Sequence, residues 1–139
     1  MLKQTFMLGA LLFGLTACQS SANIANEPVP LEGSWHIEMV LGQATIDYSP
    51  AQLTFAADGK LAGNNSCNQI FGQYQQQGEQ LTLTTAGTSR RACVNALMMQ
   101  ENKVMQALPQ VTKAKLDGGR LSLLSEDGKT VLLLSKLKL

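Results

Sequence analysis

The chain has 139 residues, which is the size of one ordinary domain. Hydrophobic residues make up 45% of it and charged residues 15%, and this composition excludes a disordered chain and a coiled coil. The formal charge of +1 predicts no basic face for nucleic acid. The three Cys and one His do not follow the ligand spacing of a zinc site, so we expect neither a metal nor a cofactor.

The first residues have the pattern of a targeting segment. Lys3 precedes an apolar run of ten residues, Phe6 to Leu15. A membrane-spanning helix needs about 20 residues, so this run is too short and fits the core of a signal peptide. The run ends at Leu15-Thr16-Ala17-Cys18, which resembles the lipobox of bacterial lipoproteins. An ordinary secretory signal with an incidental Cys at its end is the alternative.

The lipobox resemblance implies removal of residues 1–17 and attachment of diacylglycerol and a further acyl chain, such as palmitate, at Cys18. Residues 18–31 are mostly small, polar and Pro-containing, and they predict a lipidated tether, with an ordered first strand as the alternative. Gln19 stands where an Asp tends to retain proteobacterial lipoproteins in the inner membrane. The expected location is therefore the outer membrane, facing the periplasm, and the folded domain is expected over residues 32–139.

Short strands with turn signals between them follow in the rest of the chain. Trp35, Ile37 and Met39 alternate with other side chains and predict a strand with one apolar face. Asp58-Gly59 and Asp127-Gly128 are tight-turn signals. Turns every 8 to 12 residues favour a meandering antiparallel sheet. The expected strands are 35–40, 52–55, 60–62, 71–74, 80–84, 113–116, 120–124 and 130–134.

One segment, 95–108, has no Gly or Pro and is rich in helix-forming residues. Asn95 is the predicted N-cap, and Pro109 ends the helix. Helical spacing places Leu97, Val104, Met105 and Leu108 on one side. The predicted fold is α+β, an antiparallel β-sheet or partial-barrel meander with one helix packed against it. Met98, Met99 and Met105 could form a soft-metal or peptide-binding surface, but we favour Met side chains that fill gaps in the core.

The segment 63–74 is the most unusual, because it combines two Gly, three Asn and a Cys within twelve residues, and such a composition predicts a turn-rich backbone. Together with the segment 88–93, it resembles the META domain of HslJ-type bacterial heat-shock lipoproteins. The matching positions are Gly33 and Trp35, then Cys67, Asn68, Phe71, Gly72 and Tyr74, then Thr88 and Cys93, and finally Glu101 in the helix. Residues 63–66, directly before Cys67, are more polar here than in many members of that family. The resemblance implies a compact antiparallel sheet with one helix and no established activity.

The sequence offers little for catalysis. His36 is the single His, and a lone His is more commonly a surface residue than a catalyst. A Gly-x-Ser-x-Gly elbow, a phosphate loop and a metal motif are all missing from the sequence. Arg90-Arg91 could bind an anion, although adjacent Arg residues are usually solvated. We therefore predict a protein that is not an enzyme, with no catalytic, cofactor-binding or metal-binding residues.

Cys67 and Cys93 are predicted to form a disulfide. With Cys18 used for lipid, two Cys remain, and the targeting segment places them outside the cytoplasm, where disulfides persist. Two buried free thiols and a redox-active pair are the alternatives.

The expected function is that of a non-catalytic envelope lipoprotein. The resemblance implies support of outer-membrane integrity or of stress and antibiotic tolerance, through contact with an unknown protein partner in the envelope. The expected partners are the membrane, through the lipid anchor, and that protein, but not nucleic acid. The alternatives are a small-ligand or lipid-binding module with an apolar cavity between sheet and helix, and a lipoprotein that resembles a secretion pilot.

Overall fold

The computed structural model describes Gly9 and residues 27–138, so the predicted lipidation site, Cys18, lies outside the described residues. Among the described residues, no helix is long and apolar enough to cross a membrane. The elements, in chain order, are β1 (Gly33–Val40), β2 (Gln43–Ala44), β3 (Gln52–Phe55), β4 (Lys60–Asn64), β5 (Gln69–Gln77), β6 (Gln80–Thr88), α1 (Asn95–Ala107), the short 3-10 helix η2 (Leu108–Gln110), β7 (Lys113–Asp117), β8 (Arg120–Leu124) and β9 (Thr130–Lys136).

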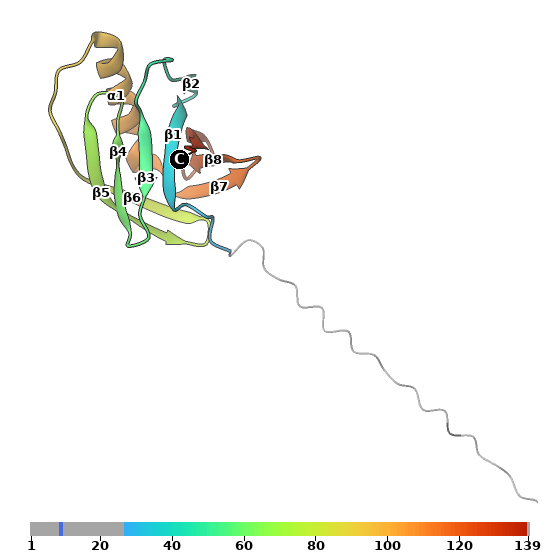
Figure 1. Cartoon of the computed structure of the whole chain (residues 1–139). Coiled ribbons are helices and arrows are strands. Elements are labelled where there is room, and N and C mark those ends of the chain that lie inside the picture. The colour runs from blue at the N-terminus through green and yellow to red at the C-terminus, as the bar shows by residue number, and fades with distance from the viewer. Residues whose placement is uncertain (1–8, 10–26, 139) are drawn as a thin grey trace, which may run out of the picture.

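The strands form one antiparallel sheet that curls into a barrel (Figure 1). Their order is β2-β1-β3-β4-β5-β6-β7-β8-β9, and a further pairing between β1 and β9 closes the ring. From β3 onward, consecutive strands in the chain are neighbours in the sheet, as in a meander, and all connections except the one between β6 and β7 are short. The predicted α+β fold, an antiparallel partial barrel with one helix, is confirmed.

The barrel is least regular between β6 and β7. These strands share a single register pair, Gln80 with Lys113, because the chain leaves the sheet after β6 to form α1 and η2. Val104 and Ala107 of α1 and Leu108 of η2 are buried. In Figure 1, α1 begins at the end of the barrel opposite to the end where residues 27–32 enter. The helical segment therefore packs apolar side chains against the barrel, with η2 against β6 and α1 against β1 and β9.

The core is one continuous cluster to which every strand except β2 contributes. Burial of each large apolar side chain contributes about 1.5–3 kcal/mol to folding. Leu31 belongs to this cluster with 2% exposure, and its carbonyl accepts a hydrogen bond of 2.8 Å from Trp35 Nε1. Val29 packs against the same cluster. Val29 and Leu31, at the end of the segment expected as a tether, are therefore part of the folded domain and pack against the barrel core.

A β-bulge changes the predicted apolar face of β1. The register of β1 against β9 shifts between Ile37 and Met39. An extra residue in one strand reverses the alternation that follows it. Val40 is therefore buried and Met39 is only half-buried, so the prediction that Trp35, Ile37 and Met39 share one face is wrong at Met39.

The helix also differs from its prediction at two points. Its N-cap is Val94, which has extended backbone and no side-chain cap, and Asn95 is the first helical residue. This boundary follows Cys93, whose position is set by a disulfide to Cys67. Met98 and Met99 are exposed, and only Met105 packs against the core, so the interpretation of all three as core-filling side chains is wrong for Met98 and Met99.

Candidate functional site

The polar loop between β4 and β5 is held by its own side chains. Asn64 Oδ1 accepts a hydrogen bond of 2.8 Å from Ser66 N. Asn65 Oδ1 accepts hydrogen bonds from Cys67 N at 3.2 Å and from Asn68 N at 2.8 Å. Short polar side chains that bond the backbone two or three residues ahead stabilise turns of this kind. They hold Ser66 at a φ of 103°, which non-glycine residues rarely adopt.

Glu101 of α1 connects the helix to this loop. Its Oε1 atom accepts a hydrogen bond of 3.0 Å from Asn65 Nδ2 and another of 2.9 Å from Asn68 Nδ2. Both Asn residues are buried, with exposures of 0% and 4%. A buried amide without a partner costs free energy, and the carboxylate is the acceptor for Asn65 Nδ2 and the nearer of two oxygen acceptors for Asn68 Nδ2, which also donates to Arg91 O at 3.3 Å. We call Asn65, Asn68 and Glu101, with the Cys67–Cys93 bond, the loop–helix cluster.

The segment before α1 completes the loop–helix cluster. Cys67 and Cys93 form a disulfide with an S–S length of 2.14 Å and a Cα–Cα distance of 5.9 Å. Asn68 Oδ1 accepts hydrogen bonds from Arg91 N at 2.6 Å and from Ser89 Oγ at 3.1 Å. Arg91 Nη2 donates to Cys67 O at 3.1 Å, so its guanidinium bonds the protein backbone. The two segments that carried the META resemblance therefore meet at the start of the helix.

A second buried polar group was not predicted from the sequence. Gln100 Nε2 donates to Ser49 Oγ and, at 3.0 Å, to Ser66 Oγ, while Gln100 Oε1 accepts from Ile46 N at 3.0 Å. All three side chains, of Gln100, Ser49 and Ser66, are buried. The one signal in the sequence is that Gln100 lies at helical spacing between Leu97 and Val104.

The loop–helix cluster thus consists of amides, a carboxylate and a disulfide bonded to one another and to backbone. Such groups hold segments together, and none of the hydrogen bonds that build the cluster involves His36. That residue lies on β1, with Gln52 of β3 and Ser135 of β9 as its cross-strand neighbours. Within residues 27–138, no group of three or more His, Cys, Asp or Glu side chains could hold a metal ion.

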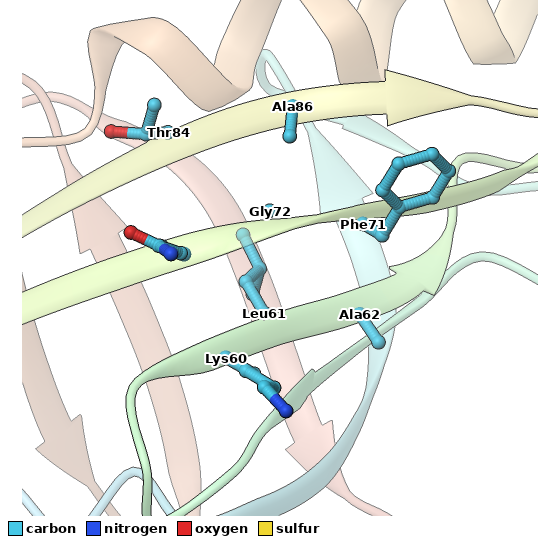
Figure 2. A pocket seen from close by; sticks show the side chains of 8 residues that line it. Lys60, Leu61, Ala62, Phe71, Gly72, Thr84 and Ala86 are labelled. Atoms are coloured by element: carbon cyan, nitrogen blue, oxygen red, sulfur yellow. The ribbon is translucent and has the colours of Figure 1, made fainter.

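A hollow of about 570 Å³ lies on the outer face of β4, β5 and β6 (Figure 2). Phe71, Ala62 and Ala86 give it an apolar part, and Thr84, Gln73 and Lys60 give it a polar part. Lys60 Nζ lies 3.4 Å from Asp58 Oδ2, and the Lys60 backbone N–H, which bonds Asp58, lowers the pKa of that carboxyl below 3.8. This hollow is outside the barrel, so it differs from the cavity between sheet and helix that the alternative function requires.

Comparison with solved structures supports the fold. The crystal structure of a DUF4847 family protein from Bacteroides vulgatus is 18% identical, has a TM-score of 0.60 and covers 78% of this chain and 95% of that one. An NMR structure of a protein from Burkholderia xenovorans is 22% identical, with a TM-score of 0.61 and coverage of 78% and 85%. At these identities the likeness concerns the fold. No curated protein matches the chain significantly.

The META domain family matches residues 28–137, which include every strand and the helix. The residues of the predicted motifs lie within this range, and the structure brings Cys67, Asn68, Cys93 and Glu101 together. The chain belongs to the META domain family.

Proposed function

We propose that this META-domain protein is a lipid-anchored envelope protein of the HslJ type that acts by contact with a protein partner and not by catalysis. The observation that carries the proposal is the bonding of the loop–helix cluster. The polar residues that mark the family, Asn68 and Glu101, use their side chains to hold the loop and the helix together. Their role is structural, which leaves the outer surface of the barrel for binding.

The surface around the start of α1 is the candidate for protein contact. Val94, Met99 and Tyr48 are exposed there at 61–64%. A single exposed apolar side chain is common on proteins, so it is the presence of three large ones around one helix end that favours a binding surface. Tyr48 belongs to the loop whose Ile46 N and Ser49 Oγ bond Gln100, so this loop lies against the first turns of the helix.

The position of this surface suits an anchored protein. Residues 27–32 enter the barrel at the opposite end (Figure 1). If lipid on Cys18 anchors the chain, we propose that the start of α1, at the end of the barrel away from residues 27–32, faces the periplasm. Support of outer-membrane integrity or of stress and antibiotic tolerance is the role that we propose for this contact.

The proposal is tested by site-specific photocrosslinking in intact cells under heat stress. A photoreactive amino acid at Met99 is expected to capture a discrete protein adduct, and the same group at Lys115, on β7, is the matched control. The adduct should be lost in Tyr48→Ser and should remain in His36→Gln. A deletion strain should regain stress tolerance with wild type and with His36→Gln. Loss of rescue by His36→Gln at normal protein level would contradict a non-catalytic function.

A further inference from the structure

The outer face of the β5–β6 hairpin carries no charge along most of its length. Its exposed residues in two adjacent rows are Gln73, Gln75 and Gln77 on β5, and Gln80, Thr82 and Thr84 on β6. We call these six residues the glutamine strip. Protein surfaces commonly have about 25–35% charged residues. The neighbouring strand β7, by contrast, exposes Lys113 and Lys115.

The register of the two strands sets the polar groups of the glutamine strip in pairs. Gln73 lies opposite Thr84, Gln75 opposite Thr82, and Gln77 opposite Gln80. Within the part of the chain that the structure describes, no hydrogen bond occupies these six side chains. The inward-facing Gln76, in contrast, donates a hydrogen bond of 2.7 Å to Val29 O. The strip therefore presents free amide and hydroxyl groups that can both donate and accept hydrogen bonds.

Phe71 extends the strip with a fixed aromatic ring. Its side chain is 55% exposed, and its cross-strand partner is Gly87. A Cβ atom on Gly87 would lie 2.7 Å from Phe71 Cζ, so the ring lies against the backbone of β6 where a side chain would otherwise stand. Figure 2 shows the ring beside Ala86, at one end of the hollow. Because residue 87 has no side chain, the Phe71 ring can pack against the backbone of β6 while part of the ring stays open to solvent.

Phe71 and the glutamine strip together form an elongated surface. At about 3.3 Å per residue, Phe71 and Gln77 lie about 20 Å apart along β5. Two hollows share this face, one of about 570 Å³ that Phe71, Gln73 and Thr84 line, and one of about 330 Å³ that Gln75, Gln77 and Thr82 line. This length suits a chain molecule of several linked rings.

We propose that Phe71 and the glutamine strip bind an uncharged oligosaccharide. Sugar hydroxyls both donate and accept hydrogen bonds, as do the Gln amides and Thr hydroxyls of the strip. The partly positive C–H face of a sugar ring fits the negative face of an aromatic ring such as Phe71. An apolar peptide would desolvate the Gln side chains without replacing their hydrogen bonds, and a charged polymer would find no row of opposite charges. The inference is independent of the lipid anchor and of the contact proposed at Met99.

The test is an NMR titration of the full chain, purified in a detergent without a sugar headgroup. The probes are two neutral tetrasaccharides at millimolar concentration, one of N-acetylglucosamine and one of glucose. The first represents the glycan of a bacterial cell wall, and the second a neutral polysaccharide without acetamido groups. Either probe should shift the backbone amide signals of β5 and β6, and their relative affinities distinguish the two sources.

Two variants and a control test the role of the ring. Phe71→Leu keeps an apolar side chain over Gly87, and Phe71→Ala removes it. Because stacking is worth about 0.5–1.5 kcal/mol, Phe71→Leu should weaken binding by roughly two- to tenfold. Tyr48→Leu, at another exposed aromatic residue, should bind as wild type does. Absence of shifts with both sugars, shifts outside β5 and β6, or wild-type affinity in Phe71→Leu would each overturn the proposal.

Discussion

Asn68 donates a hydrogen bond of 2.9 Å to Glu101 Oε1, although the two residues lie 33 positions apart in the chain. The oxygen of the same Asn side chain accepts a hydrogen bond from Arg91 N at 2.6 Å. One amide therefore joins the β4–β5 loop, the segment before α1 and the helix itself. The acidic residue of the family motif has a structural role here, which the following substitutions test.

Replacement of Glu101 by Ala should destabilise the protein, because it leaves the Asn65 amide without its acceptor and leaves Asn68 Nδ2 with the longer hydrogen bond to Arg91 O at 3.3 Å. One unsatisfied buried donor costs about 1–3 kcal/mol, so we expect a loss of about 1–3 kcal/mol in the free energy of unfolding. Glu101→Gln keeps one acceptor oxygen and should cost less. Urea denaturation measures both, with the exposed Glu126→Ala as control. Equal stability of Glu101→Ala and Glu126→Ala would show that the cluster does not support the fold.

Loss of the disulfide should also destabilise the barrel. Cys67 and Cys93 are separated by 26 positions, and the chain-entropy relation gives about 3.5 kcal/mol for a loop of this length. Cys67→Ser should therefore lower the melting temperature far more than the surface change Gln75→Ser does. Labelling of thiols under denaturing conditions checks the bond directly. Two labels on Cys67 and Cys93 without prior reduction would contradict it.

Tyr74 should make stability depend on alkaline pH. Its hydroxyl donates a hydrogen bond of 2.5 Å to Ala56 O, and its ring lies edge-on to Phe55 at 5.1 Å between centroids. Burial, with smaller effects from the charges of Glu32 and Asp58, raises the pKa of Tyr74 above 10.0. Folding thus favours the protonated phenol.

Because the pKa is raised in the folded state, this contribution is complete below pH 10 and is lost as pH rises through the folded pKa. The unfolding free energy of wild type should fall in that range more steeply than that of Tyr74→Phe. At neutral pH, Tyr74→Phe should cost about 1 kcal/mol for the lost hydrogen bond. Denaturation at several pH values measures both effects. The exposed Tyr48→Phe should follow wild type, and a pH slope in Tyr74→Phe equal to that of wild type would exclude Tyr74 as its source.

Lipid attachment at Cys18 should be visible in the mass of the purified protein. Wild type should lack residues 1–17 and carry acyl chains, because Cys18 ends a lipobox-like segment. The Cys18→Ser variant should keep residues 1–17, carry no acyl chains and leave the membrane fraction after high-salt washing. Gln19→Asp should keep the lipid and move the protein to the inner membrane in a Gram-negative host. Wild type without acyl chains would refute the anchor.

Several features of the fold were predictable from the sequence because they depend on neighbouring residues. Asp58-Gly59 and Asp127-Gly128 mark turns, and the structure gives both Gly residues a positive φ. The helix predicted over 95–108 forms over Asn95–Ala107, since its residues favour a helix, and Pro109 lies in the short η2 that follows. The spacing of Cys, Asn, Gly and Glu in the motifs was sufficient to indicate the META domain. The pairing of Cys67 with Cys93 was predicted by setting Cys18 aside for lipid.

The tertiary structure decided what depends on residues far apart in the chain. The pairing of β1 with β9 closes the barrel and introduces the bulge that buries Val40 in place of Met39. Ser49 and Ser66 lie on separate loops that only the closed barrel brings to Gln100. The Phe71 ring packs over Gly87 and stays partly exposed because β5 and β6 pair in the register that sets these two residues opposite each other. Local backbone preferences set the turns and the helix, whereas burial and strand register, which act between distant residues, set the core, the loop–helix cluster and the exposed surfaces.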